Sequence, residues 1–160
     1  MTPNERAALI DRYRAGAAAV ADAVAGITPA ELDRQPPGDG EWTAREVIHH
    51  LADSESMSYI RLRRLLAEDQ PVIQGYDEPE WARRLHYDRP IEPSLAVLAA
   101  VRAASLQLLE SLGEAEWTRT GTHTESGAYS VEGWLEVYAA HPAEHADQIR
   151  RARGAAGVAS

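Results

Sequence analysis

Histidines are the residues of this sequence whose type and spacing best fit a chemical task, and metal binding is the chemistry they would support. The chain has six: His49, His50, His86, His123, His141 and His145. On a helix, His141 and His145 would lie on adjacent turns of one face, which suits two ligands of one metal ion. Pro142 lies between them and removes the helical hydrogen bond to the Tyr138 carbonyl. A kink there is compatible with a metal-binding turn, whereas a break would separate the pair.

The direction of each side chain follows from a helical rotation of about 100° per residue. The residues within about 60° of His141 are Trp134, Val137, Tyr138 and Gln148. His141 and His145 are therefore predicted to point into the apolar stripe of the last helix. The stripe of an earlier helix consists of Val47, Leu51, Ser58, Leu62 and Leu65. His50 lies about 80 to 90° from the centre of that stripe and His49 about 170° from it. We expect His50 to turn inward and His49 to be solvated.

Each of these features has a simpler interpretation. A buried histidine is usually a hydrogen-bonded core residue, and a pair spaced by four residues occurs by chance. The third inward histidine on a second helix strengthens the metal hypothesis. His86 and His123 lie in loops, where we expect them to face solvent. The arginines Arg61, Arg63 and Arg64 are expected to form a solvated face, and Trp134 and Tyr138 to belong to the core.

Composition limits the other functions. The chain of 160 residues is predicted to form one domain, residues 1–160, with the last few residues disordered. The absence of cysteine excludes disulfides, thiolate metal sites and cysteine nucleophiles. The net charge of −9 argues against nucleic acid or an anionic membrane as a partner. No signal peptide is recognised and no apolar run approaches about 18 residues, so we expect a cytoplasmic protein.

Four segments have helical periodicity, at about residues 4–25, 43–66, 94–112 and 130–153. Capping boxes at Thr2 and Thr43 mark the first two starts. Shorter helical turns are expected at 28–31 and 80–85, and a hairpin-like loop at 118–129. Four amphipathic helices predict an all-α four-helix bundle. Because the link 67–93 is long enough to run the length of the bundle, the second and third helices can be parallel, giving up-down-down-up order.

The sequence also resembles the DinB/YfiT-like superfamily, most closely its YfiT-like branch. The resemblance rests on Trp42-Thr43, the run Glu46-Val47-Ile48-His49-His50-Leu51-Ala52-Asp53-Ser54, Tyr59-Ile60-Arg61, residues 68–73, Tyr76, the pair His141 and His145, and Gln148-Ile149. It covers nearly the whole chain. It implies an up-down-down-up bundle, often a homodimer, with nickel or zinc held by His50, His141 and His145. The comparison of helical faces selects the same three residues.

The resemblance implies a metal-dependent thiol S-transferase that joins a low-molecular-weight thiol, such as bacillithiol, mycothiol or glutathione, to an electrophilic substrate. Three neutral imidazoles leave coordination positions open, which is typical of a catalytic metal site. The first alternative is a metal-dependent hydrolase, for which Glu46 or Asp53 would be the nearest candidate bases. The second is a non-catalytic, metal-stabilised stress-response or interaction module. No catalytic residue beyond the metal ligands is assigned from the sequence.

Overall fold

The structure, a computed structural model, describes residues 1–154. The disorder expected for the last few residues falls on 155–160 and lies outside the described part. Four long helices dominate: α1 (Pro3–Val24), α3 (Ala44–Ala67), α5 (Glu92–Ser111) and α7 (Val131–Ala152). Each begins and ends within two residues of its predicted bounds. Capping boxes at Thr2 and Thr43 start α1 and α3, and the Ser130 side chain accepts from the Gly133 amide at the start of α7.

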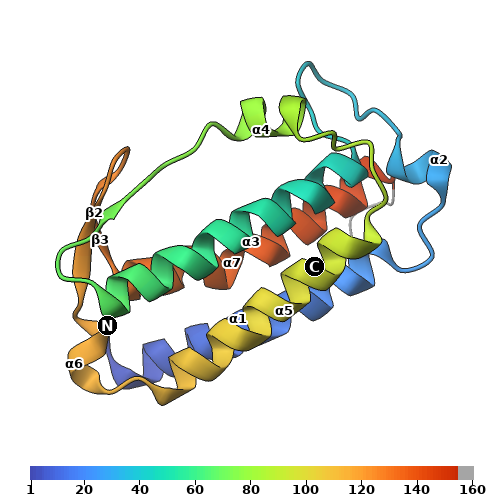
Figure 1. Cartoon of the computed structure of the whole chain (residues 1–160). Helices are drawn as coiled ribbons and strands as arrows, with labels where there is room; N and C mark the ends of the chain where they lie inside the picture. Colours follow the sequence, from blue (N-terminus) through green and yellow to red (C-terminus); the bar gives the residue numbers. More distant parts are fainter. Residues whose placement is uncertain (155–160) are drawn as a thin grey trace.

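The helices form the predicted up-down-down-up bundle. α1 packs along α7, α3 packs along both α5 and α7, and α1 also contacts α5. α1 and α7 run in one direction, and α3 and α5 run in the other (Figure 1). The parallel pair α3 and α5 is possible because the link after α3 returns along the outside of that helix and carries the short α4 (Glu78–Arg84).

The smaller elements close the two ends of the bundle. At one end lies α2 (Pro29–Leu32), which is the predicted turn. At the other lie α6 (Glu114–Trp117) and a sheet of three short strands, β1 (Val72–Ile73), β2 (Thr120–His123) and β3 (Gly127–Ser130). The predicted hairpin is the antiparallel pair β2 and β3. The two residues of β1 pair in parallel with β2, which the sequence did not indicate.

The core has two apolar clusters, one toward each end of the bundle. The cluster near α2 includes Val20, Ile48, Leu51, Leu98 and Ile149. The cluster near the sheet includes Tyr13, Leu62, Leu109, Trp134 and Tyr138. Buried polar side chains also belong to the interior, among them Glu55, Ser58, Arg102 and Ser105. Such groups require hydrogen-bond partners, so they mark positions with a role other than apolar packing.

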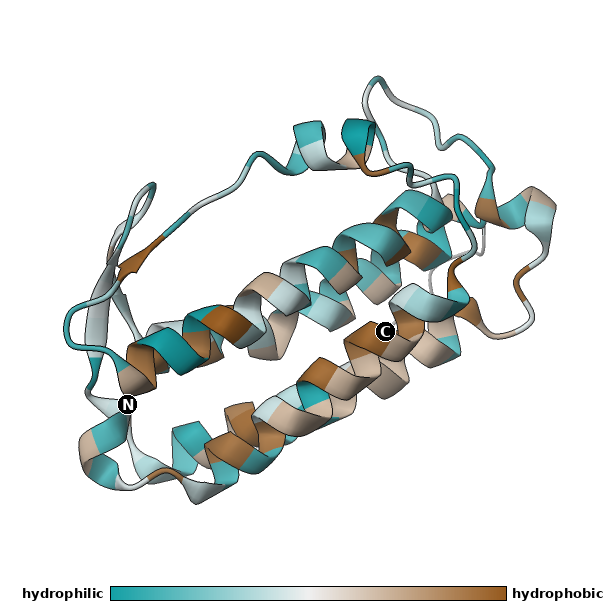
Figure 2. Cartoon of the chain, viewed as in Figure 1, coloured by the Kyte–Doolittle hydropathy of each residue, from teal (hydrophilic) through white to brown (hydrophobic). Residues whose placement is uncertain are grey.

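By length and mean hydropathy, α5 could cross a membrane, and its ribbon is largely apolar in Figure 2. In the bundle it packs against α1 and α3. Arg102 in its middle is buried and ion-paired with Glu55. An arginine that depends on a carboxylate of a neighbouring helix fits a helix of a protein core, and we interpret α5 in that way.

Candidate metal centre

The structure brings His50, His141 and His145 together between α3 and α7. One ring nitrogen of each lies within 4.8 Å of the corresponding atoms of the other two. The ring centroids are 4.6 Å apart for His141 and His145, 4.9 Å for His50 and His145, and 5.8 Å for His50 and His141. Among the described residues, no other group of histidines and carboxylates meets this distance criterion. All three predicted ligands can therefore face one ion.

The two histidines of α7 lie at the edge of its buried face, not at its centre as the sequence suggested. Val137, which was counted as part of the stripe, is 53% exposed, whereas Pro142 and Ala146 are buried. The buried face is thus rotated toward Pro142, and His141 and His145 are half-buried. This position leaves them accessible to a small ligand. Pro142 does not break the helix, which continues to Ala152 and keeps the pair on adjacent turns.

His50 is buried and faces this pair from α3. The ring of Trp42, which precedes α3, packs against His50 with centroids 4.8 Å apart. Burial lowers the pKa of His50 to about 3, with smaller contributions from the neighbouring His145 and His141. Burial also lowers the pKa of His145. These imidazoles are therefore neutral near pH 7, which is the state that binds a metal ion.

Hydrogen bonds orient the two rings of α7. The Nδ1 atom of His141 lies 3.2 Å from Oε1 of Glu55, and Nδ1 of His145 lies 2.7 Å from Oε1 of Gln148. When each Nδ1 carries the hydrogen and donates it, Nε2 keeps a free lone pair for a metal ion. A set of three imidazole nitrogens suits zinc or nickel better than magnesium or calcium. The donor set therefore fits the metal that the resemblance implies.

Glu55 and Arg102 are the site residues that the sequence reasoning missed. The guanidinium Nη1 of Arg102 donates to Oε1 of Glu55 at 2.8 Å, and both side chains are buried. A signal was present in the sequence. Glu55 is four residues after the buried Leu51, and Arg102 is four residues after the buried Leu98. Opposite charges in the apolar faces of two helices predict a buried ion pair.

His49 is not solvated as predicted, because the link before α5 covers it. Its exposed fraction is 0%. The ring nitrogens lie 2.8 Å from Oγ of Ser94 and 3.0 Å from the carbonyl oxygen of Arg89. Its ring also packs against Tyr87. His49 therefore joins α3 to the start of α5 and is directed away from the three-histidine cluster.

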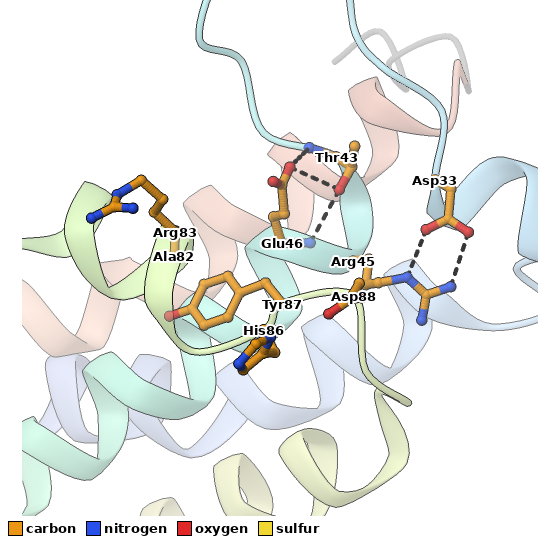
Figure 3. A pocket seen from close by; sticks show the side chains of 9 residues that line it. All are labelled: Asp33, Thr43, Arg45, Glu46, Ala82, Arg83, His86, Tyr87 and Asp88. Carbon is orange, nitrogen blue, oxygen red and sulfur yellow. Dashed lines mark hydrogen bonds and ion pairs between the residues drawn. The ribbon is translucent and has the colours of Figure 1, made fainter.

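The other two histidines also lie apart from the cluster. His123 is only 8% exposed, so the expectation of a solvent-facing ring was wrong. Along β2 exposed and buried residues alternate, so His123 lies on the covered face of the strand, and its ring packs against Tyr129. His86 is exposed as predicted. The wall of a surface pocket of about 420 Å³ contains His86 together with Arg45, Glu46 and Tyr87 (Figure 3).

Several of the polar groups that line this surface pocket are bonded to one another. Arg45 donates to both carboxylate oxygens of Asp33, at 2.6 and 3.0 Å. Glu46 accepts from the amide and hydroxyl of Thr43, as the dashed lines in Figure 3 show. None of the three clustered histidines lines this pocket. We therefore place the candidate centre at the histidine cluster.

The position of Arg61 also differs from the prediction. It was expected on a solvated face, but its guanidinium donates to the hydroxyl of Tyr138 at 3.1 Å and to the carbonyl of Gln74 at 3.0 Å. The ring centroid of Tyr138 lies 5.6 Å from that of His141. Hydrogen-bonding groups of Arg61 and Tyr138 are thus gathered beside one of the candidate ligands. Tyr138 and Trp134 belong to the core, as predicted.

Comparison with known proteins agrees with this description. The model of the DinB superfamily matches residues 12–149. A protein of Oceanobacillus iheyensis named "Putative metal-dependent hydrolase" is 44% identical over 110 residues, which are 69% of this chain and 64% of that relative. A protein of Bacillus mycoides with the same description is 34% identical over 134 residues, or 84% of this chain and 77% of its own length. The chain thus spans less than two thirds of the first of these relatives.

A solved structure extends the likeness to the whole fold. YfiT from Bacillus subtilis superposes with a TM-score of 0.88 at 30% identity, covering 95% of this chain and 87% of that one. It is described as a probable metal-dependent hydrolase with an unusual four-helix bundle topology. The family match, the bundle and the three clustered histidines point to one conclusion: the chain belongs to the DinB superfamily, in its YfiT-like part.

Proposed function

We propose that His50, His141 and His145 bind one divalent metal ion, zinc or nickel, and that the protein is a metal-dependent enzyme that transfers a low-molecular-weight thiol to an electrophile. Bacillithiol and mycothiol are the thiols we propose first. A bound metal would supply the Lewis acidity that lowers the pKa of a thiol or a water molecule beside it. The support from this chain is three imidazoles at mutual distances that one ion can span, and burial lowers the pKa of two of them, His50 and His145.

The observation that favours thiol transfer over hydrolysis is the state of the three carboxylates of α3, which include both candidate bases. Glu46 caps α3 by accepting from Thr43, Asp53 accepts from the hydroxyl of Tyr87 at 2.7 Å, and Glu55 is bound to Arg102 and His141. Metal-bound water ionises near neutral pH, but hydrolysis usually also uses a free base that takes a proton during the attack. A thiol has a pKa of about 8.5 and ionises without such a base. Because this chain has no cysteine, the sulfur would come from a cosubstrate.

The surrounding side chains suggest how a substrate would be held. Trp42 packs on His50 and offers an apolar wall on one side. Tyr138, which packs beside His141, carries a hydroxyl that accepts from Arg61 and retains its own hydrogen to donate. We propose that these groups hold a polar part of the thiol or electrophile next to the metal ligands.

Metal-dependent hydrolysis is the second candidate, and the names of the relatives favour it.

We also propose a homodimer, as the resemblance implies. Sedimentation at micromolar concentration tests the assembly, and a monomer under those conditions would reject it.

The reaction is tested with protein purified without a metal-binding tag. Metal content is measured first, and then the rate at which bacillithiol, mycothiol or glutathione reacts with a chloronitrobenzene is compared for metal-loaded protein, apo-protein and buffer. A panel of esters and amides is assayed in parallel. We expect faster thiol consumption only with the loaded protein, loss in His50→Ala, and no loss in His86→Ala, which replaces an exposed histidine. Metal-dependent ester cleavage alone would favour the hydrolase, and no metal-dependent rate would favour the non-catalytic module.

A further inference from the structure

The buried pair of Glu55 and Arg102 connects the candidate metal centre, which lies between α3 and α7, to the other two long helices, α1 and α5. We propose that Glu55, held in place by Arg102, is a positioning residue for His141. It fixes the ring so that Nε2 faces the metal ion, and its negative charge offsets part of the metal's charge. This inference rests on the proposed metal centre and adds residues that act on it without contacting the ion.

Glu55 has little freedom to move. Its exposed fraction is 1% and that of Arg102 is 3%. Arg102 donates from Nη1 to Glu55 and to the carbonyl oxygen of Tyr138 at 3.2 Å, and from Nη2 to the carbonyl oxygen of Tyr13 at 2.5 Å. Its guanidinium carbon lies 3.7 Å from the centroid of the Tyr13 ring. These contacts with α1 and α7 hold the guanidinium, and the guanidinium holds the carboxylate.

Two residues of the sequence allow the guanidinium of Arg102 to bind here: Pro142 leaves an acceptor free, and Gly16 leaves space. Pro142 lacks an amide hydrogen, so the Tyr138 carbonyl has no helical donor and accepts from Arg102 instead. Gly16 on α1 lacks a side chain at the closest approach. A Cβ atom there would lie 2.7 Å from Nη2 of Arg102 and 3.0 Å from Cγ of Pro142. The helices therefore provide a fitted site for the guanidinium.

The hydrogen-bond geometry then determines the state of His141. A single carboxylate oxygen, Oε1 of Glu55, faces both Nη1 of Arg102 and Nδ1 of His141. An ionised carboxylate can only accept, so the favourable tautomer of His141 carries its hydrogen on Nδ1. The opposite tautomer would place two lone pairs against each other. Glu55 is not a member of the group of possible ligands found among the described residues, so it acts through His141.

The two candidate ligands on α7 have different hydrogen-bond partners: the partner of His141 is the carboxylate of Glu55, and the partner of His145 is an amide. His145 is oriented by the neutral amide of Gln148. Glu55 supplies the charged partner in a buried setting, where Coulombic effects are stronger than at the surface. A buried ion pair alone is weak evidence for a role in stability, because apolar replacements of such pairs are often neutral. We therefore assign the pair to the metal centre.

The test compares wild type with Glu55→Gln, the double variant Glu55→Met with Arg102→Met, and Glu68→Gln as a control. Glu55→Gln keeps an acceptor oxygen and removes the charge. The double variant removes both charges together, so that neither is left unpaired if single changes prevent folding. Glu68, the residue that directly follows α3, is an exposed carboxylate paired with Arg64. Zinc affinity is measured by competition with a chelator, and the tautomer of His141 by long-range ¹H–¹⁵N NMR of the apo-protein.

We expect zinc affinity to fall by about 10- to 100-fold in Glu55→Gln, as for other groups that orient metal ligands. The Nδ1–H tautomer of His141 should dominate in wild type and in the control, and lose its dominance in the double variant. A folded Glu55→Gln that binds zinc within twofold of wild type, or a double variant that keeps the tautomer, would overturn the inference. If wild type failed to bind zinc, the proposed metal centre would be overturned instead. The tautomer of His141, measured by NMR of the apo-protein, would still test the role of Glu55.

Discussion

Although His49 and His50 are adjacent, replacing each by alanine should have a different effect: His49→Ala should lower the stability of the fold, and His50→Ala should lower metal affinity. His49 has an exposed fraction of 0% and bonds to Ser94 and to the Arg89 carbonyl. His49→Ala leaves these partners unsatisfied and opens a cavity, which we expect to cost about 2–4 kcal/mol. For a domain of this size each kcal/mol lowers the melting temperature by about 2–4 °C, so the expected fall is about 5–15 °C. Metal affinity should stay within a few-fold of wild type.

His50→Ala should have the reverse effect. The ring faces His141 and His145, so the variant loses one of three metal ligands. Changes to groups that only orient a ligand already cost about 10- to 100-fold, and loss of a ligand should exceed that. Wild type at a zinc concentration about 1,000 times the dissociation constant should gain about 4 kcal/mol, and His50→Ala should lose most of this gain.

The assay is a thermal melt of wild type and both variants with and without zinc, together with a calorimetric zinc titration at a temperature where all are folded. His86→Ala serves as the control for removal of a histidine outside the cluster. If His49→Ala abolished zinc binding while His50→Ala retained it, the facing of α3 would be wrong, and the site would have to be rebuilt around His49.

Three further results are expected. Helix propensity alone predicts that Gly16→Ala stabilises α1 by about 1 kcal/mol. The added Cβ atom would clash with Arg102 and Pro142, so we expect the variant to be less stable by about 1–3 kcal/mol in urea unfolding. A variant more stable than wild type would contradict the close packing at this position. The pKa of His50 in the folded protein, about 3, is below its usual value of 6.5, so between these pH values the unfolded chain binds a proton that the folded chain does not. The stability of the apo-protein should therefore fall as pH decreases from about 6.5 toward 3, and it should fall less steeply in His50→Ala. An equal dependence of stability on pH in wild type and variant would reject the assignment of this effect to His50. His86→Ala should change stability by less than about 0.5 kcal/mol, and a larger loss would place this ring inside the fold.

The sequence predicted the long helices well because their signals are local. Thr2 and Thr43 each cap a long helix with a glutamate three residues later, and both predicted capping boxes form. The order of the bundle also followed, since only a long link can join two parallel neighbours. The strand β1 could not be predicted in this way. It has two residues, and its pairing with β2 joins positions 72 and 122.

Burial of single side chains was predicted less well because it depends on distant segments. The periodicity of α3 placed His49 opposite the main stripe, and the segment around Arg89 covers that second face. His123 lies on the face of β2 that the rest of the fold covers. In both cases the residue's own helix or hairpin gives no sign of the segment that packs on it. The cluster of His50, His141 and His145 was predictable because each residue lies on or near the inner side of its own helix.

Pro142 shows how a local defect can belong to a site. Within α7 it removes one hydrogen-bond donor, and in isolation this would destabilise the helix. In the bundle, the Tyr138 carbonyl that it leaves free becomes an acceptor for Arg102, which in turn binds Glu55, the partner of His141. A residue with a helical amide at position 142 would compete with Arg102 for that carbonyl. The proline between the two candidate ligands is therefore best explained by the arginine that it helps to hold, and not by a kink that separates the ligands.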